Sequence, residues 1–446
     1  MLEKIIDKET LTALSYYISE INERLEEHFS QGFSISFSTL DSNVVSELLL
    51  PLRKGVEVAL VGLIKNSDGA LGCGLCHIDL GKKIEEKLLV MSSGGKKLRP
   101  TLYLLSEIVI SQSTLSEIHL ILAGLVELTH LLSLIVDDLV DREKRRRKQT
   151  TLHISIEDCL HQKGIKEVLA TSITGLILGT FNPGVNFVMR KSLELGQDLG
   201  LGNLLYYLTY EAQNKLWLGF KNEILMNEFL KEHYLFGTMA EYLDMIDGKT
   251  ATLFVYSVAL ALVNNRISRQ AKDSVILEDL VRRIGIAFQI ADDTRDLWDA
   301  QYKERGVGGD IIEKKPSVLT MLASIYLPEE ANRKFFSLLG SENNIKEVQD
   351  LFEEPLINVE TIDESFYQNY GLRTSKSKVS ILELATAMYY FNIRRARKII
   401  ANNEIEDKTI RSCALLIFNY FSKDLEKFKT FVQNYNVSLD YFVTDL

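Results

Sequence analysis

The stretch Leu131–Asp141, LLSLIVDDLVD, and the later stretch Ile286–Asp296, IAFQIADDTRD, share one pattern: an apolar run followed by D-D-x-x-D. On a helix, the first and last aspartates of each cluster lie four residues apart and share a face. Carboxylates at the polar end of a buried helix are costly unless a cation neutralises them. Oxygen ligands of this kind suit Mg²⁺, so two such clusters facing each other would hold a diphosphate.

The composition limits the class of protein. The chain has 446 residues, 46% of them hydrophobic, which is enough for a large core, and its net charge is −10. That charge argues against nucleic acid as a partner. The longest apolar stretches, near 120–136 and 251–263, are interrupted by Glu127 and His130 or are too short for a bilayer. Since no secretory signal is visible either, we expect a soluble, cytoplasmic protein without a transmembrane segment.

The cysteines do not indicate a disulfide framework, because there are only four in a long chain. Cys73-Gly-Leu-Cys76-His77 matches the attachment pattern of a c-type haem. That chemistry needs export, and a zinc site would need a second pair of ligands at suitable spacing. We interpret these residues as part of a loop, and the sequence leaves open whether Cys73, Cys76 and His77 have any role.

Helical periodicity extends over most of the chain, which predicts an all-α bundle with sites on facing helices. Residues 1–85 are expected to form an N-terminal helical extension of unknown role, with a strand-like alternation at 29–40. Residues 86–446 are expected to form the main domain, with a polar insert at about 354–377. The predicted helices of this domain are 84–92, 98–112, 115–140, 153–180, 186–230, 232–264, 275–300, 316–326, 329–339, 343–353, 378–403 and 406–435.

Charged residues gather near the first aspartate cluster. In Gly94–Pro100, GGKKLRP, glycines let the backbone approach a ligand, while Lys96 and Arg99 bring positive charge to a helix start. His130 lies two helical turns before the first aspartate, on the same face. The basic run 144–148 follows the cluster. Alone, such a run is typical of a solvated face, but beside three aspartates it fits a diphosphate clamp.

Three later segments carry further polar residues. Lys249 and Thr250 stand in YLDMIDGKTATLF, and Gln289 precedes the second aspartate cluster in the pair Phe288-Gln289. Arg305 and Lys315 belong to RGVGGDIIEKKPSVL. An exposed lysine or a glutamine in a polar network would explain each of these residues singly.

Over about residues 90–325 the chain resembles the trans-isoprenyl diphosphate synthase (polyprenyl synthetase) family. The segments above are similar to that family's G-G-K-x-x-R-P, R-R-G-x-P-x-x-H, K-T-A-x-L-F, F-Q-x-x-D-D and K-x-x-G-x-D-L-x-E-G-K-x-T-L-P patterns. Some positions depart from them: Lys148 and Thr150 replace a glycine and a proline, and Arg305 replaces a lysine. The family's G-Q-x-x-D has no clean match in 205–230, where the nearest text contains Gln213 and Glu223.

The resemblance implies an isoprenoid-synthase-type helical bundle that condenses isopentenyl diphosphate head to tail with an allylic diphosphate. The residues implied for isopentenyl diphosphate are Lys96, Arg99, His130 and Arg147. Those implied for the allylic diphosphate and its surroundings are Arg146, Lys249, Thr250, Gln289, Arg305 and Lys315. The resemblance implies three Mg²⁺ ions, bound by Asp137, Asp138, Asp141, Asp292, Asp293 and Asp296. It implies that the catalytic residues are Asp137, Asp141, Asp292 and Lys249.

Product length and assembly follow from the resemblance alone. In the family, aromatic residues four or five positions before the first aspartate stop elongation early. Here those positions are Leu132 and Ser133, so we expect geranylgeranyl diphosphate or a longer product. Family members are usually homodimers, and we expect the same here. Two alternatives remain open: a class I terpene synthase or a prenyltransferase for another acceptor on the same fold, and a non-catalytic subunit of a heteromeric synthase.

Overall fold

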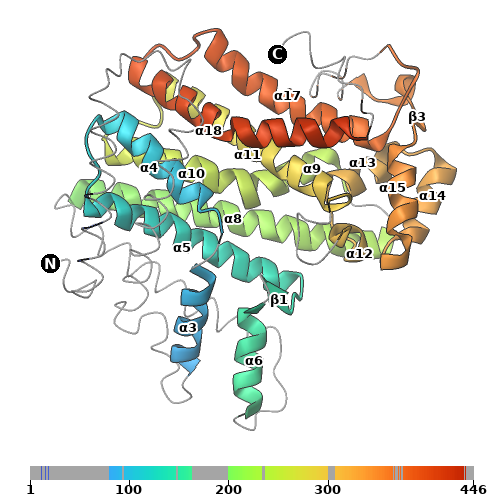
Figure 1. Ribbon diagram of the computed structural model, residues 1–446, viewed down its shortest axis with the longest axis horizontal. Coiled ribbons are helices and arrows are strands. Elements are labelled where there is room, and N and C mark those ends of the chain that lie inside the picture. The colour runs from blue at the N-terminus through green and yellow to red at the C-terminus, as the bar shows by residue number, and fades with distance from the viewer. Residues whose placement is uncertain are drawn as a thin grey trace. The chain divides into compact units, whose positions relative to one another are not determined.

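The computed structural model describes residues 80–92, 95–146, 149–162, 199–233, 237–299, 307–364 and 375–435, with a few isolated positions besides. These residues are almost entirely helical, so the expected all-α fold is confirmed (Figure 1). The chain divides into two compact units, each assembled from three segments. The N-terminal extension, the strand-like 29–40 segment, and Cys73, Cys76 and His77 lie outside the described residues.

Unit 1 comprises residues 1–213, 253–278 and 405–420. At its centre is α5 (Glu117–Val140), a helix that is apolar on nearly all sides and therefore buried. Helix α4 packs along α5, and Figure 1 shows α3 and α6 side by side near the end of α5 that carries β1. The remaining elements of this unit are α3 (Leu80–Ser92), α4 (Leu98–Ser111), β1 (Arg145–Arg146), β2 (Gln149–Thr150), α6 (Leu152–Gln162), most of α10 (Thr252–Asn264) and the first part of α8 (Leu199–His233).

Unit 2 comprises residues 214–252, 279–404 and 421–446. Its elements include the last part of α8, α9 (Met239–Ile246), η4 (Asp247–Ala251) and most of α11 (Lys272–Asp296). They continue with α12 (Gly309–Ile312), α13 (Val318–Tyr326), α14 (Glu329–Leu338), η5 (Glu342–Asn344), α15 (Ile345–Glu353), β3 (Ile357–Asn358), η6 (Val359–Thr361), β4 (Lys378–Val379), α17 (Ile381–Ala401) and the second half of α18 (Lys408–Gln433), whose first half belongs to unit 1. The strands β3 and β4 pair antiparallel within the expected polar insert and just after it.

One predicted helix is interrupted. The 232–264 segment was expected to be continuous, but Gly237 has a φ of 106° and Thr238 caps a new helix. The Thr238 hydroxyl accepts from the Glu241 backbone, while the Glu241 carboxylate accepts from the Thr238 backbone. This reciprocal cap starts α9 at Met239. Further along, the π-helical turn η4 inserts one residue into the ladder at the segment that contains Lys249.

Two helical stretches, Ile118–Val140 and Met239–Asn264, are long and apolar enough to cross a membrane by composition. However, 78% and 89% of their apolar windows are buried inside the protein. Helices that are buried in this way are explained as core helices of the bundle.

Candidate active site

The loop before α4 places two neighbouring lysines differently. Lys97 adopts a left-handed backbone conformation with a φ of 49°, and its side chain is fully buried. The Lys97 ammonium donates to the Ser92 carbonyl at 2.6 Å and to Glu127 Oε1 at 3.0 Å. Lys96 is exposed instead. Lys97 therefore fixes the loop from inside, and Lys96 remains on the surface.

Arg99 and His130 are brought together, as their predicted common role requires. Arg99 Nη1 donates to His130 Nε2 at 2.9 Å, and His130 Nδ1 lies 3.3 Å from Glu127 Oε2. These contacts assign the proton of the neutral ring to Nδ1. The Arg99 guanidinium also lies 5.3 Å from the centre of the Phe254 ring. The side chains form one connected polar cluster, Lys97–Glu127–His130–Arg99.

Burial and charge set the protonation states of this cluster. Burial lowers the pKa of His130 to about 4, and the nearby Arg99 charge adds to the effect. Burial alone would raise the pKa of Glu127, but its contacts with His130 and Lys97 outweigh burial and bring the pKa to about 2. Because His130 is neutral near pH 7, Lys97 is the partner that keeps Glu127 ionised. Arg99 thus carries the positive charge at the edge of the cluster.

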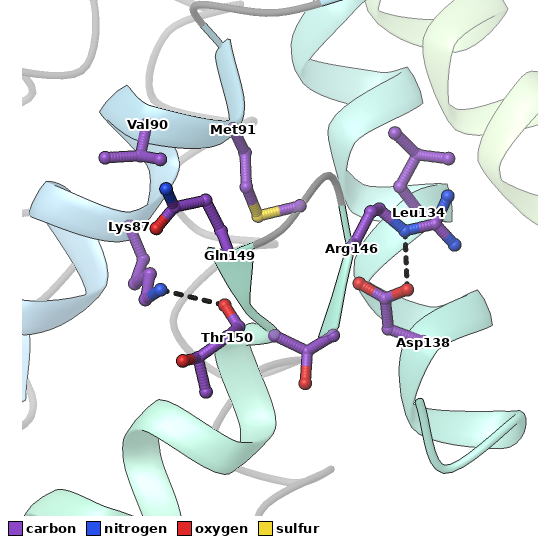
Figure 2. A pocket seen from close by; sticks show the side chains of 9 residues that line it. Lys87, Val90, Met91, Leu134, Asp138, Arg146, Gln149 and Thr150 are labelled. Carbon is purple, nitrogen blue, oxygen red and sulfur yellow. Dashed lines mark hydrogen bonds and ion pairs between the residues drawn. The ribbon is translucent and has the colours of Figure 1, made fainter. Parts of the chain in front are cut away.

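The first aspartate cluster ends α5. Arg146, on the hairpin strand β1, donates from Nε to Asp138 at 2.5 Å (Figure 2). Its Nη2 donates to Asp137 at 3.1 Å. Burial raises the pKa of Asp138 to about 6, although Arg146 opposes that shift. Asp141 is the C-terminal cap of the helix, one turn from Asp137. One guanidinium therefore pairs with two of the three carboxylates, and its single charge leaves this end of the helix negative.

The residues of this cluster fit a hard divalent cation. Asp138 is 1% exposed, and its Oδ2 makes no hydrogen bond within the described part of the chain. A buried carboxylate oxygen without a donor is satisfied by a cation or by water. Within the same part, no three acidic, histidine or cysteine side chains are already gathered as a metal site. Assembly of a Mg²⁺ site would therefore need the carboxylates to turn towards the ion.

The second aspartate cluster is held by hydrogen bonds from uncharged groups. Asp293 accepts from the Tyr242 hydroxyl at 2.7 Å, from Gln289 Nε2 at 2.7 Å and from the Val318 backbone at 2.9 Å. Thr250 donates to Gln289 Oε1 at 2.6 Å, which extends the network to the π-helical turn. Burial raises the pKa of Asp293, and Asp310 adds to the rise. Gln289 thus lies in a polar network, one of the two possibilities that its position allowed.

The other two aspartates of this cluster differ in setting. Asp296 is buried and accepts from the Asp310 backbone at 3.0 Å, which connects α11 to the start of α12. Asp292 is partly exposed at the same end of α11. Lys315 forms an ion pair with Glu313 at 2.6 Å, and its backbone donates to the Asp310 carbonyl. Of the three carboxylates, Asp292 is thus the most accessible to a ligand.

Lys249 projects from the π-helical turn towards α8. Its ammonium lies 2.5 Å from the buried Glu223 and 4.9 Å from the centre of the Phe220 ring. The backbones of α8 and η4 approach closely here, because a Cβ on Gly219 would lie 2.7 Å from the backbone nitrogen of Lys249. Only glycine fits at Gly219, and this contact places Glu223 and Phe220 around the ammonium.

Several of these partners were not predicted from the sequence. Glu127 lies three residues before His130 on the same helix face, and this spacing is the signal that would have found it. Glu223 lies four residues after Gly219, as Asp does after Gly in G-Q-x-x-D, with Phe220 in place of Gln. Tyr242 and Lys97 carried no comparable signal. Two predicted residues, Arg147 and Arg305, lie outside the described part of the chain.

The described residues form an all-α fold, and each aspartate motif lies at the C-terminal end of a long helix, α5 or α11. The family model for polyprenyl synthetase matches residues 83–355, more than half of the chain, so the chain belongs to the polyprenyl synthetase family. This family membership makes the chain a trans-prenyltransferase of the isoprenyl diphosphate synthase type.

Named relatives and solved structures agree with that assignment. A short chain isoprenyl diphosphate synthase of Methanocaldococcus jannaschii is 27% identical over 57% of this chain and 70% of its own length. A geranylgeranyl diphosphate synthase of Sulfolobus acidocaldarius is 26% identical over 60% of this chain and 75% of its own. The crystal structure of a geranylgeranyl pyrophosphate synthetase from Pyrococcus horikoshii matches with a TM-score of 0.54 and 21% identity, covering 81% of this chain and 98% of its own. The last comparison supports the fold.

Proposed function

We propose that this chain condenses isopentenyl diphosphate with an allylic diphosphate to give an all-trans prenyl diphosphate, and that the reaction depends on Mg²⁺. The observation that carries the proposal is the end of α5, where Arg146 spans Asp137 and Asp138 and one oxygen of Asp138 has no donor in the described region. At such a site the negative charge of the carboxylates is offset by a cation that can be exchanged. Binding of a metal–diphosphate complex requires such an exchange.

Isopentenyl diphosphate binds, in this proposal, at the edge of the polar cluster of unit 1. Arg99 presents a guanidinium that is already oriented by His130 and by Phe254, so little side-chain entropy is lost on binding a phosphate. Lys96 adds an ammonium from the exposed loop. His130 is neutral and acts through its contact with Arg99. Arg147, which lies outside the described residues, is assigned to the same set on the sequence pattern alone.

The allylic diphosphate is bound by residues of both aspartate motifs. Asp137, Asp141 and Asp292 would hold Mg²⁺, which would supply positive charge to the leaving pyrophosphate. We assign three ions to the complete site, with Asp138, Asp293 and Asp296 supporting the first three carboxylates. Arg146, Lys249 and Arg305 contribute positive charge to the leaving group. Thr250, Gln289 and Lys315 fix the backbone and the network around it.

The reaction requires no side-chain nucleophile. Positive charge from Arg146 and Lys249 favours departure of pyrophosphate, and the resulting allylic cation is attacked by the isopentenyl double bond. The proton that is then lost passes to the departing pyrophosphate. The neighbouring residues contribute by orienting the two substrates and by excluding water.

The product is proposed to be geranylgeranyl diphosphate or longer. Leu132 and Ser133, five and four residues before Asp137, are both buried, and neither has an aromatic ring that could obstruct a growing chain. The Ser133 hydroxyl donates to the His130 carbonyl at 2.7 Å, so it is turned towards its own helix. Replacing Leu132 with Phe should therefore shorten the product.

A homodimer in the cytoplasm is the proposed state of assembly. The surface that supports it lies on the first part of α8, where four large side chains are exposed on one side of the helix. These residues are Leu204, Tyr206, Tyr207 and Tyr210, with exposed fractions of 58%, 44%, 67% and 53%. Tyrosine-rich apolar patches of this kind are typical of protein interfaces. Light scattering of the wild type and of Tyr207→Glu should give a dimer and a monomer, respectively.

The proposed function is tested by incubating the purified chain with Mg²⁺, labelled isopentenyl diphosphate, and dimethylallyl, geranyl, farnesyl or geranylgeranyl diphosphate in turn. Label in longer prenyl alcohols, after dephosphorylation, is the expected result and gives the product length. Hydrocarbon without label would instead identify a terpene synthase. No turnover by the folded chain would identify a partner-dependent subunit.

A further inference from the structure

The hairpin that carries Arg146 is anchored at its base and on one side. The strands β1 and β2 pair Arg145 with Thr150 and Arg146 with Gln149. At the base, the Thr151 backbone donates to the Lys144 carbonyl at 3.1 Å, and the Thr151 hydroxyl donates to the Glu143 carbonyl at 2.7 Å. On the α5 side, Arg146 reaches the two aspartates. These contacts leave the outer edge of β2 to be fixed by another element.

The pairing pattern directs one carbonyl outwards. Since Lys144 and Thr151 form a hydrogen-bonded pair, the neighbouring pair of Arg145 and Thr150 is a non-hydrogen-bonded pair in an antiparallel ladder. The backbone groups of such a pair point away from the partner strand. The Thr150 carbonyl therefore faces the outside of the hairpin, where α3 lies.

Helix α3 supplies the donor for this carbonyl. The Lys87 ammonium donates to the Thr150 carbonyl at 2.8 Å, and Figure 2 shows the two groups across a small cavity from the Arg146–Asp138 contact. Val90 and Met91 of α3 and Leu134 of α5 line the apolar part of the same cavity. Lys87 is partly buried, so its hydrogen bond is less exposed to competing water than a surface contact.

The size of the cavity indicates support rather than ligand binding. Its volume is about 40 Å³, room for two or three water molecules on the order of one per 15 Å³. A prenyl chain or a diphosphate does not fit in this space. The cavity separates α3 from the buried side of Asp138 and Arg146, so the hydrogen bond from Lys87 to Thr150 is what connects α3 to the hairpin there.

We propose that Lys87 is a positioning residue that holds the Arg146 hairpin against the first aspartate cluster, and thereby sets the affinity for the allylic diphosphate. This inference rests on the proposed function of Arg146. Lys87 acts through the backbone of the hairpin and touches no substrate.

The C-terminal end of α3 has a separate anchor, which limits the effect of losing the Lys87 hydrogen bond. The Ser92 carbonyl, near the last turn of α3, accepts from Lys97, which is itself paired with Glu127. This anchor does not depend on Lys87, so loss of the Lys87 contact should loosen the hairpin while the Lys97 loop stays in place. The allylic site should therefore respond more strongly than the isopentenyl site, of whose assigned residues only Arg147 belongs to the hairpin segment.

The test compares Lys87→Met, which keeps the length of the side chain but removes the donor, with Lys87→Arg, which keeps a donor. Lys334→Met is the matched control, because Lys334 is exposed on α14. Two properties are measured: hydrogen exchange of the 143–151 peptide in the free protein, and the KM for geranyl diphosphate and for isopentenyl diphosphate with kcat. A thermal melt of each variant checks that it is folded.

For Lys87→Met we expect faster exchange of the hairpin and a KM for geranyl diphosphate raised about 5- to 30-fold, as for loss of one charge-assisted hydrogen bond. The KM for isopentenyl diphosphate should rise less than the KM for geranyl diphosphate, and Lys87→Arg should recover most of the affinity.

Three results would overturn the proposal: unchanged exchange of the hairpin, equal changes in both KM values, or loss of folding in Lys87→Met together with an inactive Lys87→Arg. The exchange measurement needs no turnover, so it tests Lys87 even if the wild type does not elongate. Absence of elongation by the wild type would contradict the proposed function, whereas unchanged exchange in an active enzyme would contradict only the role of Lys87.

Discussion

The two aspartate motifs have the same sequence pattern but are held by different chemistry. In unit 1, Asp137 and Asp138 both form ion pairs with Arg146, and the neighbouring polar cluster contains the ion pair of Lys97 and Glu127. In unit 2, Asp293 is surrounded by donors that carry no charge, a hydroxyl, an amide and a backbone nitrogen. Ion pairs can be exchanged for a charged ligand. A carboxylate saturated by neutral donors is more suited to fixing geometry.

This difference suggests a division of labour. The side chains around the first motif have charges that a diphosphate and its metal can replace. The second motif leaves Asp292 as its accessible carboxylate, while Asp293 and Asp296 bind the surrounding helices together. Identical motifs therefore need not have identical roles at each position. The predictions below test that comparison.

The largest effect is expected from the carboxylates that we assign to metal. Asp137→Asn and Asp292→Asn should each lower kcat about 10⁴-fold, roughly 5 kcal/mol of activation free energy, because charge balance on the leaving group is lost. Both variants should stay folded, since neither residue is fully buried. Steady-state elongation assays and thermal melts measure these quantities. An Asp292→Asn enzyme with wild-type kcat would contradict the role of the second motif.

A large loss of stability is expected in the charged cluster of unit 1. Glu127→Gln leaves the ammonium of Lys97 buried without its counterion, which should cost about 3–5 kcal/mol of unfolding free energy. The double variant Glu127→Gln with Lys97→Met removes both charges and should recover most of that loss. Denaturant unfolding of the three proteins makes the comparison. A double variant as unstable as Glu127→Gln would show that packing, rather than charge, dominates here.

Stability should also depend on pH through this cluster. His130 has a folded pKa of about 4, below its ordinary value, so between pH 6.5 and 4 the unfolded chain binds more protons and stability falls as the pH falls. Full expression of this shift corresponds to at most about 3 kcal/mol. Glu127, with a folded pKa of about 2, extends the loss from pH 4.5 downwards.

The His130 contribution is isolated by substitution. Melting temperatures of the wild type and His130→Gln between pH 4 and 7 should diverge, with a flatter profile for the variant. His161→Gln removes an exposed histidine on α6 and serves as the control, with a profile like the wild type. Parallel profiles for all three proteins would be evidence against a buried neutral His130.

A smaller effect is expected in the neutral network of unit 2. Tyr242→Phe removes one of three donors to Asp293 and should cost about 1–2 kcal/mol of unfolding free energy. Tyr326 also donates to an aspartate, Asp363, at 2.9 Å, but that contact is solvent-exposed. Tyr326→Phe should therefore cost about 0.5 kcal/mol or less. Equal costs for the two variants would mean that burial of the Asp293 network has no energetic weight.

Much of the fold could be predicted because helical periodicity is a local property. The segment 115–140 was predicted as a helix, and α5 covers Glu117–Val140. The break at Gly237 was missed, because the periodicity on both sides continues in phase while a single left-handed residue ends the helix. The π-helical turn at Lys249 was missed for a related reason. It changes the backbone without changing the pattern of residues.

The site could be predicted in part. Motifs located Arg99 and His130 at one place, and the structure joins them directly. The sequence could not distinguish Lys96 from its neighbour Lys97, since their exposure depends on the backbone conformation of the loop. Tyr242 was also beyond reach. Its contact with Asp293 joins residues 51 positions apart, and only the packing of two helices creates that contact.

One measurement tests the central claim most directly. The chain is freed of metal with a chelator and incubated with geranyl diphosphate and labelled isopentenyl diphosphate, with and without added Mg²⁺. We predict that label enters longer prenyl diphosphates only when Mg²⁺ is present, with one pyrophosphate released for each isopentenyl unit added. Consumption of geranyl diphosphate with no incorporation of label, or elongation that proceeds unchanged without the metal, would contradict this account.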